Sequence, residues 1–239
     1  MILAILQARM SSTRLPGKVL RPLAGGPMIL RQIERTRRSR LIDLLVVATS
    51  DDKTDDVLTD VLEGKGVEVF RGPLDDVLAR YLGALEAKGP ADHVVRMTAD
   101  CPFIDWQVID AVIQAHVEAG VDYTANTWER RTFPRGLDVD VVTSAVLRQA
   151  AAEATDPYDR EHVLPFIYRR PDRYSLQGFS QERDEGELRW TVDLPEDLAF
   201  ASAVYDALYP DNPAFTSEDV RGFLAGRPDL AEAGGQRRI

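Results

Sequence analysis

The chain has 239 residues, of which 44% are hydrophobic and 28% are charged, and its formal net charge is -10 at pH 7. This length suits one large α/β domain of a globular protein. The negative charge disfavours non-specific contact with nucleic acid, so we expect no nucleic-acid partner. No apolar run approaches the roughly 20 residues that span a bilayer, and a single cysteine, Cys101, excludes an internal disulfide. We therefore expect a cytoplasmic protein with no membrane partner.

The first residues predict a buried strand that opens into a polar loop. Residues 2–6 form an uninterrupted apolar run, which is typical of a central strand. Residues 7–18 then include three cations, two serines, a threonine, a proline and a glycine. Cations and free backbone N–H groups after a strand are what a polyphosphate requires. The spacing of the P-loop is absent, and a basic surface loop is the alternative interpretation.

Strand and helix patterns alternate as far as residue 119. We expect strands at 44–48, 67–70 and 93–97, and helices at 28–37, 54–65, 75–88 and 106–119. This order predicts an α/β fold of three layers, with a mostly parallel sheet covered on both faces. Ligands of such sheets bind beyond the carboxyl ends of the strands. The polar loop and Asp100 both fall at that edge.

The second half of the chain is less regular. We expect strands at 138–142, 174–179 and 188–192, the last two as a small antiparallel pair, and helices at 144–153, 159–169 and 195–208. Pro171 would end the helix at 159–169. Residues 1–225 would form a single domain, and residues 226–239 would be a frayed tail.

Two aspartates follow expected strands and precede prolines. Asp100 comes after the strand at 93–97 and before Pro102, where a carboxylate can hold a divalent cation. It can also cap the next helix, although Asp105 is the better candidate for the cap. Asp193 lies just before Pro195, and it is either a second metal ligand or part of a helix start.

Other polar residues allow a structural and a functional interpretation. His162 can hydrogen-bond a sugar hydroxyl or a carboxylate, or it can be a structural histidine. Arg35, Arg37, Arg38 and Arg40 are most simply the solvated end of a helix, since cations are favourable near a helix C-terminus.

Five short motifs occur in a familiar order, at residues 7–18, 96–102, 133–138, 160–163 and 189–193. Together they resemble the spore-coat polysaccharide cytidylyltransferase-like family, which is related to CMP-KDO, CMP-sialic acid and CMP-pseudaminic acid synthetases. The resemblance covers about residues 1 to 205. It implies a fold of the nucleotide-diphospho-sugar transferase type, CTP as the donor and Mg²⁺ as the cofactor.

The resemblance also implies roles for individual residues. The nucleotide would be bound by the polar loop, through Ala8, Arg9, Ser12, Arg14 and Lys18. The metal would be held by Asp100 and Asp193, and the acceptor would meet Arg135, Asp138 and His162. Catalysis would depend on Arg14, Lys18 and Asp100. The sialic acid enzymes have a denser acidic cluster at the second metal position, which leaves the number of metals open.

Three functions are consistent with these residues. The first is transfer of CMP from CTP to an acidic sugar or similar acceptor, with release of pyrophosphate, in surface polysaccharide or glycoconjugate biosynthesis. The second is a metal-dependent glycosyltransferase, which Pro102 disfavours because such enzymes commonly carry Asp-x-Asp at this place. The third is a non-catalytic nucleotide-binding protein. From the related synthetases we expect a homodimer, with residues 127–133 near the partner.

Overall fold

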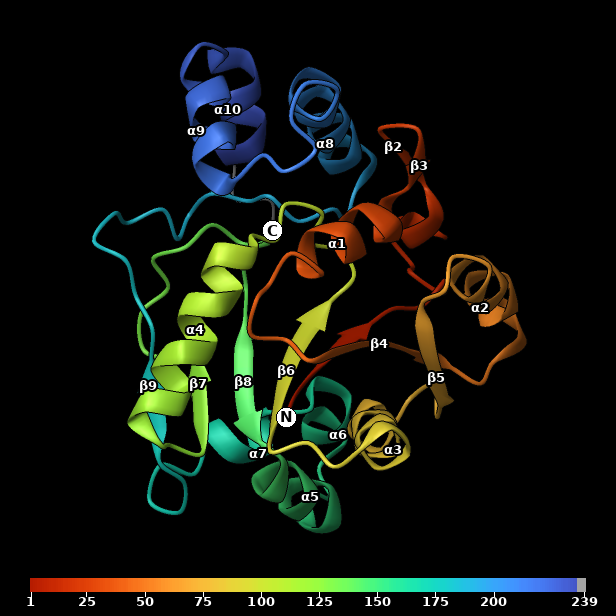
Figure 1. Ribbon diagram of the computed structural model, residues 1–239, viewed down its shortest axis with the longest axis vertical. Coiled ribbons are helices and arrows are strands. Elements are labelled where there is room, and N and C mark those ends of the chain that lie inside the picture. The colour runs from red at the N-terminus through yellow and green to blue at the C-terminus, as the bar shows by residue number, and fades with distance from the viewer. Residues whose placement is uncertain (236–239) are drawn as a thin grey trace.

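The computed structural model describes residues 1–235, and its centre is a seven-stranded sheet with the order β5-β4-β1-β6-β8-β7-β9 (Figure 1). The strands are β1 (Ile2–Gln7), β4 (Leu44–Ser50), β5 (Glu68–Gly72), β6 (His93–Thr98), β7 (Tyr123–Ala125), β8 (Asp140–Thr143) and β9 (Leu176–Gly178). The first four of these pair in parallel, whereas β8 runs antiparallel to β6 and β7, and Figure 1 shows the arrows of β6 and β8 pointing in opposite directions. The prediction of a mostly parallel sheet is confirmed.

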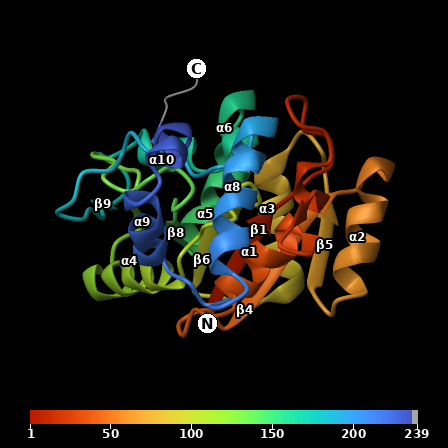
Figure 2. The ribbon, with the colours of Figure 1, turned by 90° about the horizontal axis from the view of Figure 1, so that it is seen from above.

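Helices cover both faces of the sheet and give the three predicted layers. One face packs against α1 (Met28–Thr36), α2 (Asp56–Glu63) and α4 (Trp106–Ala119). The other face packs against α3 (Val77–Lys88), α5 (Ser144–Glu153) and α7 (Pro165–Tyr168). Strand β1 shows why, because its side chains alternate between the two faces: Leu3 and Ile5 enter one core, and Ala4 and Leu6 enter the other. Seen from above in Figure 2, β5 and β9 lie at opposite ends of the sheet.

A third apolar cluster lies beyond the sheet, under the helices drawn in blue at the top of Figure 1. These helices are α8 (Pro195–Leu208), α9 (Ser217–Ala225) and α10 (Pro228–Gly235), and the short hairpin of β2 (Pro22–Leu23) and β3 (Gly26–Pro27) adjoins them. Residues 228–235, expected to be frayed, instead form α10, whose apolar residues pack on this cluster. The rest of the expected tail, residues 236–239, lies outside the described residues.

Two expectations for the second half are wrong. The helix expected at 159–169 is divided into α6 (Pro157–His162) and α7, with Val163 between them at φ 73°. The left-handed backbone of Val163 ends α6, and Pro165 begins α7, because a proline has no N–H with which to continue the first helix. The segment 188–192 is no strand: it makes one isolated bridge, between Arg135 and Arg189, while β9 pairs in parallel with β7. The expected antiparallel pair therefore does not form, and β8 is the antiparallel strand of this half.

The predicted cap of α4 is confirmed. Asp105 caps α4 as expected, accepting a hydrogen bond from the Gln107 N–H, and its other oxygen accepts one from the Ser217 N–H at 2.7 Å. That second contact ties the start of α9 to the start of α4. Among residues 1–235 no helix is both long enough and apolar enough to cross a membrane.

A buried histidine pair joins α4 to the sheet. His116 is fully buried; its Nδ1 lies 3.0 Å from Thr124 Oγ1, and its Nε2 lies 3.1 Å from His93 Nδ1. Burial, and then the neighbouring His93, lower the pKa of His116 to about 4. Because the same side chain titrates near 6.5 when exposed, the folded protein binds fewer protons than the unfolded chain between these values.

We expect acidification to weaken the fold through this residue. The contribution of His116 is fully present above about pH 6.5 and is lost as the pH falls to about 4, a change of about 3 kcal/mol in the free energy of unfolding. Urea unfolding of the parent and of His116→Gln across this range measures it, and the variant should lose less stability on acidification. His162→Gln is the control for removing an imidazole from an exposed position. Identical pH dependence of the parent and His116→Gln would contradict the assignment.

Candidate nucleotide and acceptor site

The polar loop after β1 is closed by its own backbone. The Met10 carbonyl accepts hydrogen bonds from the Ser12 and Gly17 N–H groups, at 2.9 and 3.0 Å. The Met10 N–H donates to Oδ1 of the buried Asp55 at 2.7 Å, which fixes the start of the loop. Gly17 has φ 67°, a left-handed conformation that glycine adopts without strain. The turn it makes begins the 3₁₀ helix η1 (Lys18–Leu20) and directs Lys18 toward the sheet edge.

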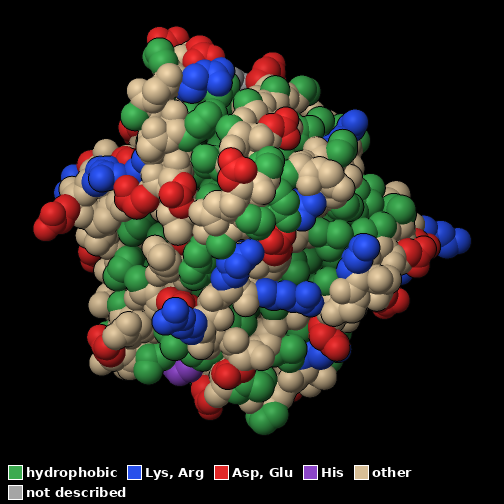
Figure 3. All heavy atoms as spheres, turned by 45° about the horizontal axis from the view of Figure 1, so that its top comes forward, with side chains coloured by type: hydrophobic (Ala, Val, Ile, Leu, Met, Phe, Trp, Pro, Cys, Tyr) green, Lys and Arg blue, Asp and Glu red, His purple; other side chains and the backbone are tan. Residues whose placement is uncertain are grey.

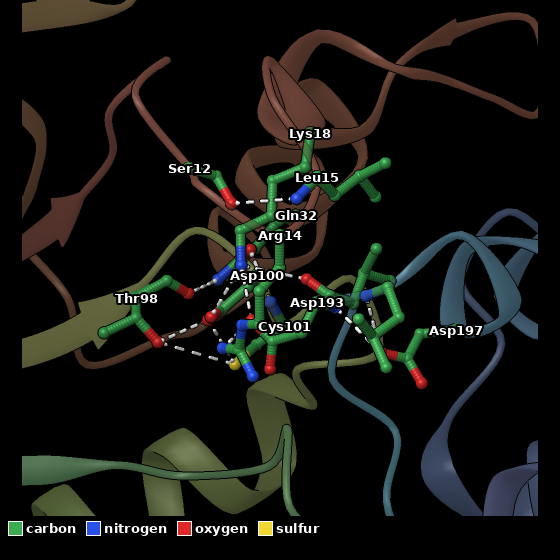
Figure 4. Close-up of polar contacts among 12 residues, drawn as sticks. Ser12, Arg14, Leu15, Lys18, Gln32, Thr98, Asp100, Cys101, Asp193 and Asp197 are labelled. Carbon is green, nitrogen blue, oxygen red and sulfur yellow. Dashed lines mark hydrogen bonds and ion pairs between the residues drawn. The ribbon is translucent and has the colours of Figure 1, made fainter. Parts of the chain in front are cut away.

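Lys18 meets both predicted metal carboxylates. Its Nζ donates to Asp100 Oδ2 at 3.1 Å, to Asp193 Oδ1 at 2.8 Å and to the Val192 carbonyl at 2.9 Å. Figure 4 shows these side chains pointing toward one another from three separate parts of the chain. The Val192 N–H also donates to the Asp100 carbonyl at 2.8 Å, which joins the two acidic segments directly.

Further polar contacts surround the two carboxylates. Asp193 also pairs with Arg14 at 2.8 Å and with Arg189 at 2.5 Å. Asp100 Oδ1 accepts from the Thr98 hydroxyl at 2.7 Å and from the Cys101 thiol at 3.4 Å. Three cations thus neutralise the two carboxylates, and Asp197, which accepts from the Asp193 N–H at 2.9 Å, is a further acid beside them.

The ionisation of the cluster follows from these contacts. Burial alone would lower the pKa of Lys18, but Asp100 and Asp193 outweigh it and raise that pKa above its ordinary value. Burial opposes ionisation of Asp100 as well, yet Lys18 and the Thr98 hydroxyl bring its pKa below the usual range. Burial and the nearby Asp100 raise the pKa of the Cys101 thiol, so Cys101 stays protonated and is no nucleophile.

A cavity of about 340 Å³ opens beside this cluster. It brings together most of the residues that the sequence singled out, namely Ala8, Arg9, Ser12, Arg14, Lys18, Asp100, Asp193 and His162. Arg9 is exposed, whereas Ala8 forms part of the buried wall. Figure 3 shows the face formed by the top of Figure 1, on which Lys and Arg side chains are interspersed with acidic groups, and the cavity itself takes its positive charge from Arg9, Arg14 and Lys18. The cavity is therefore lined for an anionic ligand.

A second cavity of about 470 Å³ adjoins the first, since Arg96, Thr98 and His162 line both. Its wall is aromatic at Trp128, Tyr158 and Tyr168, and polar at Asp138, which forms an ion pair with Arg131. A polyhydroxylated ring suits such a lining, because aromatic faces cover its apolar side and carboxylates accept from its hydroxyls.

Arg135 lines neither of these cavities. It borders a separate hollow with Arg130, Asp184 and Glu187, on the segment that carries the bridge to Arg189. Gly136, at φ 106°, reverses the chain immediately after it. Asp138 consequently lines the second cavity and Arg135 does not, so the structure does not bring Arg135 together with Asp138 and His162, the other residues predicted to meet the acceptor.

The comparisons with known proteins agree with this geometry. A family model described as cytidylyltransferase matches residues 3–218. The spore coat polysaccharide biosynthesis protein SpsF of Bacillus subtilis (strain 168) is 36% identical over 237 residues, which are 96% of each chain. The chain belongs to the cytidylyltransferase family.

Other members of the cytidylyltransferase family extend the likeness. The 3-deoxy-manno-octulosonate cytidylyltransferase of Anaeromyxobacter sp. (strain K) is 36% identical over 244 residues, covering 97% of this chain and 95% of its own. A solved cytidylyltransferase from Leptospira borgpetersenii serovar Hardjo-bovis (strain JB197) is 28% identical and superposes with a TM-score of 0.91 over 100% of this chain and 98% of its own. A CMP:2-keto-3-deoxy-manno-octonic acid synthetase complexed with CTP is 17% identical with a TM-score of 0.66, over 86% of this chain and 98% of its own, and shows the shared fold.

Two basic residues of the site belong to the five sequence motifs, but the sequence analysis gave them no function. Arg96 on β6 pairs with Asp140 at 3.0 Å, and the Tyr123 hydroxyl donates to the other oxygen of Asp140 at 2.7 Å. Burial would lower the pKa of Arg96, but Asp140 raises it, so the guanidinium at the junction of the cavities stays charged. The alternation of β6 is the signal that places Arg96 on the same side as Thr98. The contact of Arg189 with Asp193, four residues later, was not predicted because residues 188–192 were expected to form a strand.

The donor set at Asp100 and Asp193 fits a hard divalent cation. Both offer carboxylate oxygens that converge on the single point where the Lys18 ammonium lies. Within residues 1–235, no group of three or more His, Cys, Asp or Glu side chains could hold a metal ion. Mg²⁺ is commonly held by one or two carboxylates together with substrate phosphates, so two aspartates beside a phosphate-sized cavity are sufficient.

Proposed function

We propose that this cytidylyltransferase transfers CMP from CTP to an acidic sugar or similar acceptor, releasing pyrophosphate, in surface polysaccharide or glycoconjugate biosynthesis. The observation that carries the proposal is the meeting of Lys18, Asp100 and Asp193 beside two adjoining cavities, in a chain of this family. Two relatives support an acidic sugar acceptor and a role in polysaccharide biosynthesis, because one is a 3-deoxy-manno-octulosonate cytidylyltransferase and the other is a spore coat polysaccharide biosynthesis protein.

In this mechanism an acceptor oxygen attacks the α-phosphorus of CTP and pyrophosphate leaves. Such chemistry depends on positioning and on neutralising charge rather than on a protein nucleophile. Arg9, Arg14 and Lys18 bind the triphosphate, and Lys18 and Arg14 stabilise the charge that develops on the leaving pyrophosphate. Ser12, which lines the cavity, completes the loop contacts. When bound, Mg²⁺ held by Asp100 and Asp193 supplies additional positive charge to the phosphate oxygens.

The base is bound where β1 ends. Ala8 forms the wall, and its N–H is already used by the Ala48 carbonyl at 3.1 Å. Gln7 lines the same cavity, and its buried Oε1 has no hydrogen-bond partner within the described part of the chain. An unpaired buried acceptor is costly, and the 4-amino group of cytosine is a donor that would satisfy it.

The acceptor occupies the second cavity, between the aromatic wall and the cavity junction. Asp138 and His162 line it, and both offer groups that bind hydroxyls. Arg96 reaches the junction from β6 with its Nε buried and unpaired among residues 1–235. It is therefore placed to contact either the acceptor or the phosphate that receives it.

Base choice tests the proposed function directly. We expect CTP with Mg²⁺ to raise the melting temperature more than ATP or GTP do at equal concentration, because the 4-amino group of cytosine satisfies Gln7 while the larger purine rings of ATP and GTP would meet the wall at Ala8. Gln7→Leu should lessen the advantage of CTP. Equal shifts for the three nucleotides would show that the pocket does not read cytosine.

The products separate this proposal from the alternatives. Release of pyrophosphate from CTP on addition of an acidic sugar supports a cytidylyltransferase, whereas release of a nucleoside diphosphate from a nucleotide sugar would indicate a glycosyltransferase. Binding of CTP without turnover of any acceptor would indicate a nucleotide-binding protein.

We further propose that the enzyme acts in the cytoplasm, where its nucleotide donor is found, as a homodimer that uses residues 127–133. Light scattering that gives a monomeric mass would contradict the dimer.

A further inference from the structure

Lys18 lies between the two carboxylates, in the position that a cation held by both would take. An ammonium group carries three N–H donors. In Lys18 these meet Asp100 Oδ2, Asp193 Oδ1 and the Val192 carbonyl, at 3.1, 2.8 and 2.9 Å. The side chain is only 12% exposed, and Figure 4 shows it entering between Asp100 and Asp193. In this state Lys18 has no donor left for a phosphate.

The ammonium and a shared metal ion exclude each other. Magnesium–oxygen distances are about 2.0–2.1 Å, so an ion bound to Asp100 Oδ2 and Asp193 Oδ1 would fall within the volume that Nζ occupies. Two cations at that separation repel each other strongly in a partly buried site. Lys18 must therefore leave the carboxylates before a metal can bind both.

The other cations near this point are placed differently. Arg14 contacts Asp193 Oδ1, which Lys18 also contacts, from a largely exposed position, and Arg189 contacts Asp193 Oδ2 and Asp197. Neither makes an ion pair with Asp100, so within residues 1–235 Lys18 is the cation that joins the two acids. Displacement of Lys18 is therefore the movement that frees an oxygen of Asp100 and an oxygen of Asp193 at once.

We propose that Lys18 is the counter-ion of the nucleotide-free site, and that this site takes the divalent metal together with CTP, as one complex. A metal arriving alone leaves the Lys18 ammonium without its three acceptors in a partly buried place, which is unfavourable. A metal–triphosphate complex brings phosphate oxygens that accept from Lys18 as it moves, and the four-carbon stem gives it that reach. The proposal rests on the proposed function for the identity of the nucleotide.

Coupling between the two ligands follows. If CTP removes Lys18 from the carboxylates, CTP raises the affinity for the metal, and the metal raises the affinity for CTP by the same factor. We expect this factor to be about tenfold or more in the parent protein. In Lys18→Met the shared position is open from the start, so the metal should bind without nucleotide and the factor should fall toward one.

The probe is Mn²⁺, counted as free ion by its electron paramagnetic resonance signal in titrations of the intact protein with and without CTP. We expect Mn²⁺ alone to bind Lys18→Met at least about tenfold more tightly than the parent. Arg14→Met is the matched control, since it removes one positive charge beside Asp193 without opening the shared position, and it should change Mn²⁺ affinity far less. Lys18→Gln gives a second test if the methionine variant melts early.

Several results would overturn the proposal. Tight binding of Mn²⁺ to the nucleotide-free parent, with no gain on adding CTP, would show that Lys18 does not hold the position. Equal gains in Mn²⁺ affinity in Lys18→Met and Arg14→Met would show that the gain comes from the loss of one positive charge and not from opening the shared position. The two proposals fail separately, because the titration with Mn²⁺ alone contains no nucleotide. If the protein does not bind CTP, the proposed function is disproved, whereas the Mn²⁺ affinities of the parent and Lys18→Met still test the role of Lys18.

Discussion

Asp100→Asn is expected to abolish most turnover while leaving the fold intact. The amide keeps the size of the side chain but carries no charge, so it is a poor ligand for a divalent cation and a poor partner for Lys18. We expect pyrophosphate release from CTP, Mg²⁺ and an acidic sugar to fall by about 100-fold or more, which corresponds to about 2.7 kcal/mol in the activation barrier. The assay compares purified parent and variant across a panel of acidic sugars.

The same change should have little effect on stability. The Asp100 carbonyl, which accepts from the Val192 N–H, belongs to the backbone and is kept, and Lys18 still pairs with Asp193 in the variant. Melting temperatures of parent and variant should therefore lie within a few degrees of each other. Asp60→Asn, on the exposed side of α2, controls for the loss of one acidic charge and should keep parental turnover. Parental turnover in Asp100→Asn would refute the role of Asp100.

The part of the site built on neighbouring strands could be predicted from the sequence. Lys18 follows β1 and Asp100 follows β6, and these strands are adjacent and parallel, so their carboxyl ends meet at one edge. The apolar runs and helical stripes that indicate such strands are local signals. Asp193 follows residues 188–192, which were expected to be a strand but form an irregular connection, so strand order could not place it beside Asp100. Only the resemblance to a family joined it to Asp100.

The direction of single side chains could not be predicted in the same way. Arg135 and Asp138 stand three residues apart, and the positive φ of Gly136 decides that they face different hollows. Strand β7 has only three residues, too few for alternation to be recognised. Arg35 was assigned to a solvated helix end, yet it is 2% exposed. Burial of a charged side chain depends on what packs against the helix, which a pattern of residue types does not reveal.

Replacing Arg35 should produce a large loss of stability. Its guanidinium donates to the carbonyl groups of Ile104, Phe215 and Phe103, at 2.7, 2.8 and 3.3 Å, and lies 4.3 Å from the Phe215 ring centroid. Arg35→Met fills the space of the stem but leaves these buried carbonyls without donors, at about 1–3 kcal/mol for each unsatisfied group. We expect the free energy of unfolding to fall by about 3 kcal/mol or more, measured by urea denaturation.

Arg37→Met is the matched control, because Arg37 lies at the same helix end but is exposed. It should change the free energy of unfolding by no more than about 0.5 kcal/mol, and equal losses in the two variants would contradict the distinction.

The position of Arg35 also links stability to the site. Together with Gln32, which donates to the Thr98 carbonyl and accepts from the Cys101 N–H, it holds the segment that carries Asp100 against α1. Arg35→Met should therefore loosen that carboxylate as well, and it should lower the CTP-induced gain in melting temperature where Arg37→Met does not.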